Sequence, residues 1–456
     1  MNKPPVLRPS FFRILGQRDF RLLWISQAVG RLGDQFYLVA LPWLVLKLTG
    51  DPLAMGLVLA TASIPRALFM LLGGAVTDRF STRQVMLVSF LLRLAMVSML
   101  AALVLAGRIE LWMLYGFAFL FGLVDAFYYP ALNSSVPQLV DQAELQTGNA
   151  LIQGAGQLSL FAGPVLAGAL IAFLDGTRSI GGRPVSDLFG IGLVFALNAF
   201  TFLLSALTMW RMPNHLPRIN EHSQDADSNV WLSIREGLAY VREDATLLTF
   251  FVVTGAITFL INGPFSIGVP VLADTRFSEG AAAFGIIMSA YGGGALAGTI
   301  CAGALPKPAA KWFGSLLLIV SSGLGIGLAL LGIVSATGPA AGVAFLMGMA
   351  NGYVVILFIT WLQNRTPAEL LGRMMSLLMF ALVGLNPISA ALAGMFIKLN
   401  IAWLFVGAGS TLVVIVLVSL FNPAIRNMGS GQIGGLQIND PEILNRDGGP
   451  SRSNLI

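Results

Sequence analysis

The sequence is dominated by long apolar runs that follow one another with few polar residues between them. Two of these runs, 53–77 and 84–106, are separated by only a few residues around Asp78 and Arg83. A helix needs about 20 apolar residues to cross a bilayer, and helices satisfy all their backbone hydrogen bonds there. Because 56% of the residues are hydrophobic and 11% are charged, the runs predict an all-α polytopic membrane protein.

Twelve apolar runs can be placed along the chain, in two groups of six. We expect a cytosolic N-terminal arm (1–19), a six-helix half (20–211), a cytosolic central loop (212–246), a second six-helix half (247–422) and a disordered cytosolic tail (423–456). Trp231, Ile234, Leu238 and Val241 recur at helical spacing in the central loop. They favour an amphipathic helix on the inner membrane face over a plain solvated linker. The predicted spans are 20–48, 53–77, 84–106, 111–130, 145–173, 189–211, 247–272, 281–305, 311–336, 339–362, 373–398 and 401–421.

The basic residues give the expected orientation, because cytosolic loops carry an excess of Lys and Arg. With the N-terminus inside, most of the 27 Lys and Arg residues fall in cytosolic segments. Both termini are therefore expected in the cytosol. Six bases fall outside (Lys47, Arg108, Arg178, Arg183, Arg276 and Lys398), and three lie within spans (Arg31, Arg66 and Arg93).

Composition also excludes several kinds of function. The net charge of +5 is spread over loops, so we expect no nucleic-acid partner. The single Cys301 excludes an internal disulfide and a multi-cysteine metal site, and both histidines, His215 and His222, lie in the polar central loop. No phosphate-binding Gly-rich loop occurs, and no catalytic triad or metal-ligand cluster stands out. We expect no enzyme activity, metal or cofactor, and a monomer whose partners are a small-molecule substrate, protons and the lipid bilayer.

The short polar stretch after the second run resembles the cytosolic signature loop of the major facilitator superfamily. That pattern reads Gly-x-x-x-Asp-Arg-x-Gly-Arg-Lys/Arg, and Gly74, Asp78, Arg79 and Arg83 fall on matching positions. Ser81 and Thr82 replace a glycine and a base of the pattern. The resemblance implies twelve helices in two six-helix halves related by an axis along the membrane normal. It also implies that Asp78 latches the halves in the outward-facing state; the alternative is an ordinary charged hairpin.

A second resemblance lies in the fifth run. Gly163, Pro164 and Gly168 match the Gly-Pro-x-x-Gly-Gly signature of exporters and antiporters in the same superfamily, with Ala167 in place of one glycine. Proline removes a backbone hydrogen bond and bends a helix, and small residues allow close helix packing. The resemblance implies a bend that controls which side the cavity opens to, and the alternative is a plain kinked span.

Charged residues inside the first four runs are the candidates for chemistry. Arg31 and Asp34 are three residues apart and share a helix face, and Arg66, Arg93 and Asp125 lie in the next three runs. The three arginines fall roughly 14–17 Å from the cytosolic ends of their spans, with both acids near that level. Such residues are costly in lipid and should face a cavity or each other. Either they form a static ion-pair network, or they serve proton coupling or substrate contact. In the second case Asp34 is the best candidate for the proton carrier, with Arg31 one turn away to stabilise its charged form. Asp125 is the fallback, with Arg93 as its possible partner.

The first run, with Trp24, Asp34 and Trp43 in their local sequence context, resembles the branch that contains macrolide-efflux and enterobactin-export proteins. This implies a transporter in a plasma membrane, the inner membrane of a bacterium, that expels a small, largely apolar, drug-like molecule by proton antiport and alternating access. A siderophore or lysophospholipid transporter of the same fold is one alternative. A membrane sensor or scaffold that transports nothing is another.

Overall fold

The computed structural model describes residues 10–141, 144–175, 179–180, 183–184, 188–213, 239–305, 310–366, 374–375, 377–378 and 380–421. Almost every described segment is helical. The N-terminal part contains α1 (Ser10–Gly16), α2 (Arg18–Thr49), α3 (Pro52–Arg79), α4 (Thr82–Leu105), α5 (Leu111–Ser135), η1 (Val136–Gln138), α6 (Leu145–Asp175), β1 (Ser179–Ile180), β2 (Arg183–Pro184) and α7 (Phe189–Trp210). The C-terminal part contains α9 (Ala245–Gly263), η3 (Pro264–Gly268), α10 (Val269–Thr275), α11 (Ala281–Ala304), α12 (Ala310–Leu331), α13 (Thr337–Arg365), η4 (Phe380–Gly384), α15 (Asn386–Ile397) and α16 (Ile401–Leu420).

Ten stretches of the described chain are long and apolar enough to cross a membrane. They include α4, α7 and the continuous unit formed by α9, η3 and α10. Two predicted spans are not among the ten. The first, α2, is 32 residues long, but Arg31 and Asp34 lower its hydropathy. The eleventh predicted span is described only in part, and its α15 is a shorter apolar helix. The all-helical membrane fold is thus confirmed, whereas the count of twelve spans is only partly supported.

Short turns follow from local sequence at both ends of the helices. Gly50 ends α2 with a φ of 61°, a left-handed conformation that suits glycine. At the other end of α3, the Ser81 side chain accepts a hydrogen bond from the Gln84 N–H and caps α4. The tight hairpin expected around Asp78 and Arg83 is therefore present, with only two residues between the helices.

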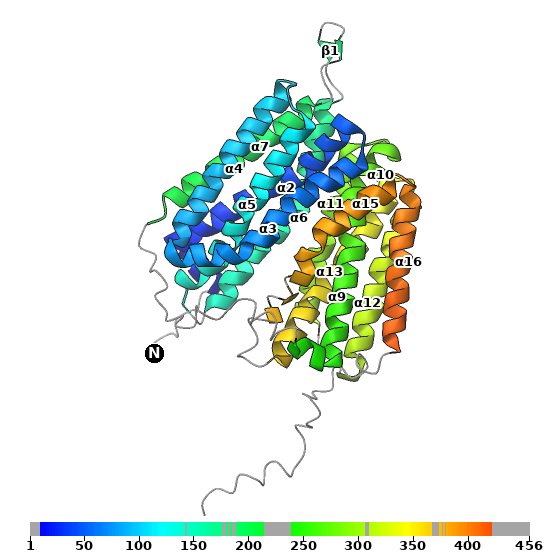
Figure 1. Cartoon of the computed structure of the whole chain (residues 1–456). Helices are drawn as coiled ribbons and strands as arrows, with labels where there is room; N and C mark the ends of the chain where they lie inside the picture. Colours follow the sequence, from blue (N-terminus) through cyan, green and yellow to red (C-terminus); the bar gives the residue numbers. More distant parts are fainter. Residues whose placement is uncertain are drawn as a thin grey trace, which may run out of the picture.

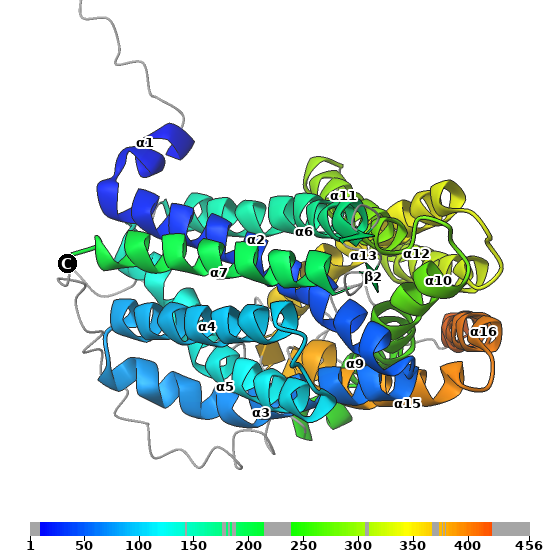
Figure 2. The same ribbon diagram turned by 90° about the horizontal axis from the view of Figure 1, so that it is seen from above.

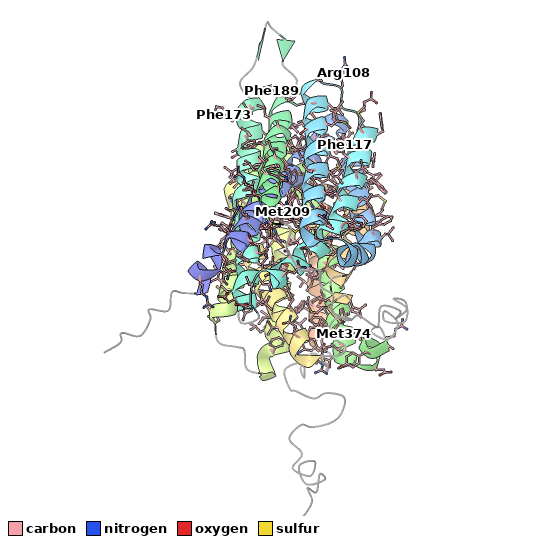
Figure 3. All side chains as sticks on the ribbon, turned by 90° about the vertical axis from the view of Figure 1, so that its left-hand side faces the viewer. Arg108, Phe117, Phe173, Phe189, Met209 and Met374 are labelled. Carbon is pink, nitrogen blue, oxygen red and sulfur yellow. The ribbon has the colours of Figure 1, made fainter. Side chains whose placement is uncertain are left out.

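The two halves lie side by side and meet at one end (Figure 1). They converge toward the end that carries the β1–β2 hairpin, which we call the hairpin end, and they diverge toward the opposite end. Figure 2 shows the same two groups of helices from above, with α2 through α7 on one side and α9 through α16 on the other. In Figure 3, Arg108, Phe173 and Phe189 lie at the hairpin end.

Glycines allow the halves to approach closely. A Cβ added to Gly56 of α3 would lie 2.6 Å from the carbonyl oxygen of Ala390 in α15. A Cβ on Gly285 of α11 would meet the carbonyl oxygen of Pro164 in α6. Small residues permit this kind of backbone contact between membrane helices. The contacts between the halves therefore rest on α3 with α15 and on α6 with α11.

Several predictions lie outside the described residues. These are the amphipathic helix in the central loop up to residue 238, the first part of the N-terminal arm (1–9) and the tail from residue 422. The five-part division of the chain therefore stays a prediction.

Candidate functional site

A central cavity of about 450 Å³ lies between the two halves. Its N-terminal wall comes from α2, α3, α5 and α6, and its C-terminal wall from α9, η3, α11 and α15. Apolar side chains such as Leu38, Phe121, Phe265 and Met288 make up much of the lining. A cavity of this size between two helical units is where a small ligand would bind.

The N-terminal wall carries a cluster of charges, which we call the charge cluster: Arg66, Arg93, Asp34 and Asp125. Arg93 and Arg66 both contact the carboxylate of Asp125, one at each oxygen. The Arg93 side chain is only 1% exposed, and its guanidinium lies 4.2 Å from the ring centre of Tyr128. Asp125 is 10% exposed. Two arginines thus contact this carboxylate at the same time.

Asp34 is held much less tightly than Asp125. Its Oδ1 lies 3.3 Å from Nη1 of Arg93, and its side chain is 29% exposed and lines the cavity. The structure thus pairs Asp34 with Arg93 of α4, not with Arg31 one turn away on α2. A single long contact and access to the cavity distinguish Asp34 from Asp125.

The contacts of Arg31 differ from those that its place beside Asp34 in the sequence suggests. Within the described parts of the chain it forms no ion pair with a carboxylate. It lines the cavity, and its guanidinium packs against Gly156 of α6, where a Cβ would meet Nη1. Arg31 and Asp34 lie on the same face of α2. The Arg31 guanidinium, however, packs against Gly156 of α6.

The C-terminal wall carries polar groups but no charge. None of the described residues that line it is Asp, Glu, Lys or Arg. Asn262 of α9 donates a hydrogen bond from Nδ2 to Oδ1 of Asn386 in α15, at 2.7 Å. In the sequence both asparagines lie inside apolar runs. Nothing in the sequence indicates that their side chains contact each other within the C-terminal half. The site thus divides into a charged wall and an amide-bearing wall.

Two reciprocal ion pairs join the halves at the hairpin end. Lys47 at the end of α2 contacts Asp274 of α10 at 2.7 Å. Asp51, between α2 and α3, accepts from Lys398 after α15 at 2.8 Å. We call them the outer ion pairs. In the sequence, Lys47 and Lys398 stand out only as bases outside the membrane, because a local pattern does not show which half supplies the partner.

The Asp51–Lys398 pair is not sensitive to pH near neutrality. Burial alone would raise the pKa of Asp51, but hydrogen bonds from Lys398 and from the Leu53 N–H outweigh it and lower the pKa below 3.8. A carboxyl group with a lowered pKa contributes stability above its ordinary value, and that stability is lost as the pH falls through the lowered value. The Asp51–Lys398 pair is therefore intact at neutral pH.

We expect charge reversal at this pair to open the hairpin end. Lys398→Asp places two acids opposite each other, whereas Asp51→Lys combined with Lys398→Asp restores the attraction. An exposed pair contributes about 0.2–1 kcal/mol, so the single change should raise the labelling rate of a cavity cysteine roughly two- to fivefold. The reporter is Leu38→Cys in a Cys301→Ser background, treated with a thiol reagent from the hairpin side. Equal labelling of the single and double variants would show that the pair does not hold the ends together.

The signature loop is described only in part. Arg83 donates hydrogen bonds to the carbonyl oxygens of Met209 (3.2 Å) and Trp210 (2.7 Å), at the end of α7. A base at a helix C-terminus is favourable, because the last carbonyls have no partner within the helix. Gly74, Asp78 and Arg79 lie in the last turns of α3, and their side chains are outside the described residues. The latch function of Asp78 therefore stays a prediction.

The Gly-Pro motif lies at the interface between the halves. α6 continues through Pro164, and a Cβ on Gly168 would meet the carbonyl oxygen of Ala281 in the other half. The Val165 N–H donates to Oγ of Ser289 in α11 at 2.8 Å. Gly163 instead faces Gln35 of α2. The motif is thus well placed for a contact that changes when the halves move, although the bend itself stays a prediction.

No group of three His, Cys, Asp or Glu side chains in the described part of the chain could hold a metal ion. The charge cluster supplies two carboxylates beside a cavity with room for a small organic molecule.

Comparisons with known proteins agree with this arrangement. The sequence profile of the Major Facilitator Superfamily matches residues 23–388. The chain is 25% identical to the uncharacterized MFS-type transporter YfiS of Bacillus subtilis, over 90% of this chain and 94% of the relative. It is 21% identical to macrolide efflux protein A of Streptococcus pyogenes, over 90% of this chain and 97% of that relative. Among solved structures, the nucleoside transporter NupG superposes with a TM-score of 0.71 at 12% identity, over 88% of this chain and 100% of NupG.

Proposed function

The chain belongs to the Major Facilitator Superfamily, and from that premise we propose that it exports a small, largely apolar compound in exchange for protons. The relatives and structural neighbours are transporters, which points away from an enzyme. The observation that carries the proposal is the central cavity, which combines apolar lining with one loosely held carboxylate, Asp34.

The apolar lining supports a largely apolar cargo. Aromatic and aliphatic side chains from both halves line the cavity, including Leu41, Phe121, Tyr291 and Met288. Burial of apolar surface gives about 25 cal/mol per Å², so such a cavity favours drug-like molecules over strongly hydrated ones. The relationship to a macrolide efflux protein supports export as the direction.

The charge cluster supports the proton step. In the arrangement described, Asp34 shares Arg93 with Asp125. A proton on Asp34 would remove its attraction to Arg93 and change the balance between two states of the transporter. Only a difference in interaction free energy between two states can shift their populations. Arg31 and Arg66, which also line the cavity, set the field that Asp34 experiences.

The orientation in the membrane is part of the proposal. With the termini in the cytosol, the closed hairpin end faces outward, and the structure is an inward-open state of a monomer in the plasma membrane. The outer ion pairs and the contact of α3 with α15 then form the closed outer gate. In this state the predicted latch at Asp78 would be released.

The proposal is tested by accumulation of erythromycin, a macrolide, in cells that lack their own efflux pumps. Cells with the protein should accumulate at least threefold less drug than cells without it, and a protonophore should abolish the difference. Cells that express the Asp34→Asn variant at the same level are the matched control. Unchanged accumulation across a panel of macrolides and apolar dyes, with the protein present in the membrane, would contradict export.

A further inference from the structure

The two cavity asparagines lie beside breaks in their helices. Asn262 precedes η3, a π-helical turn that begins at Pro264, and Asn386 follows η4, a second π-helical turn. Proline cannot donate the backbone hydrogen bond that continues an α-helix, and π-turns are frequent at functional sites. The Gly263 N–H donates instead to Oγ of Ser389 on α15, at 2.8 Å. This cross-link fixes the two irregular segments against each other.

The amide pair presents one acceptor and one donor to the cavity. Asn262 uses one N–H and Asn386 uses its oxygen in their mutual bond. The oxygen of Asn262 and the amino group of Asn386 remain, and both residues line the central cavity. Exchanging oxygen and nitrogen in both side chains reverses the bond but again leaves one oxygen and one amino group. The complementary ligand group is therefore uncharged and both accepts and donates, as an amide does.

A side pocket of about 140 Å³ lies beside Asn262 within the C-terminal half. It shares Ile261 and Asn262 with the central cavity, and α13 supplies Asn351 and Phe358. The hydroxyl of Thr254 in its wall is buried and has no hydrogen-bond partner among the described residues. A cavity of about 150 Å³ accommodates a benzene ring. The side pocket thus has room for one ring beside the amide pair.

We propose that the Asn262–Asn386 pair and the side pocket form a recognition subsite for an uncharged aryl amide, with the ring in the pocket and the amide group on the asparagines. The subsite rests on the proposed export function, because it identifies the class of cargo for the same cavity. In this proposal the two walls have different roles: the N-terminal wall binds the proton and the C-terminal wall selects the cargo.

The test uses two probes of equal length, benzanilide and trans-stilbene, which differ in the amide that joins two phenyl rings. Binding is measured by equilibrium dialysis against the purified full-length protein in detergent. A site that hydrogen-bonds its ligand discriminates against an analogue without the group, and one hydrogen bond corresponds to about a threefold to tenfold change. Asn262→Leu and Asn386→Leu should each lower the affinity for benzanilide by that factor. Each should change the affinity for trans-stilbene less than twofold. Retained trans-stilbene binding shows that the variant is folded.

A third variant tests the pocket separately from the amides. Val355→Phe adds a ring to the wall of the side pocket and should weaken both probes equally, at least fivefold. The subsite is wrong if the ratio of the two affinities is the same in the parent and the asparagine variants, or if benzanilide does not bind the parent protein. These measurements need no gradient. A protein that shows the ratio but exports nothing would refute the proposed function alone, and one that exports with an unchanged ratio would refute the subsite alone.

Discussion

Asp34→Asn should abolish proton-driven transport while leaving cargo exchange intact. The asparagine mimics the protonated carboxyl and cannot release a proton, so the variant is fixed in one coupling state. In proteoliposomes with an imposed pH gradient, we expect the rate of cargo accumulation to fall at least tenfold. Exchange of labelled for unlabelled cargo without a gradient should stay within about twofold, since that half-cycle requires no proton transfer.

Asp125→Asn is the matched comparison, because it removes the same charge from the other carboxylate. Asp125 contacts both Arg66 and Arg93 and is mostly buried, so its loss should reduce the amount of folded protein more than it changes coupling. If the Asp34→Asn variant still accumulated cargo at the full rate in a pH gradient, a residue other than Asp34 would carry the proton. Asp34 would then be a member of a static ion-pair network.

Arg93→Leu should destabilise the protein more than any other single change in the charge cluster. The arginine is 1% exposed and contacts both carboxylates, so its removal leaves two acids without their shared base. Breaking a buried pair by removing one partner costs about 3–5 kcal/mol. We expect the apparent melting temperature in detergent to fall by several degrees, with a smaller yield of monodisperse protein.

Two controls separate loss of the pair from loss of a large side chain. Arg31→Leu removes an arginine that lines the cavity and has no carboxylate partner among the described residues. This change should lower the free energy of unfolding by less than about 1 kcal/mol. Replacement of a buried pair by apolar residues is often neutral. Arg93→Leu combined with Asp125→Leu should therefore recover part of the lost stability. Equal destabilisation by Arg31→Leu and Arg93→Leu would contradict the assigned pairing.

The sequence predicts the helices well because the length and hydropathy of a span are local properties. The predicted span 84–106 corresponds to α4 at Thr82–Leu105, and 189–211 corresponds to α7 at Phe189–Trp210. Hydropathy does not reveal the break at Pro264, because α9, η3 and α10 together form one continuous apolar span. A π-turn changes the hydrogen bonding of the backbone without changing the apolar character of the run.

Partners across the fold are harder to predict than members of the site. The five charged positions were found by their cost in lipid, and four of them meet in the charge cluster. Helix spacing favours Arg31, three residues away, as the partner of Asp34, whereas tertiary packing brings Arg93 from α4, 59 residues away. The outer ion pairs join residues 227 and 347 positions apart, and no local periodicity connects such positions.

The separation of charges and amides onto opposite walls makes the two halves exchangeable in principle. Within the described chain, the intramembrane charges belong to α2 through α5, and the side pocket belongs to α9, α13 and η4. A chimera that receives residues 247–421 from a relative would inherit a new cargo preference but keep its source of energy. Adaptation to a new toxic compound could then proceed by substitutions in one half, without repeated adjustment of the other.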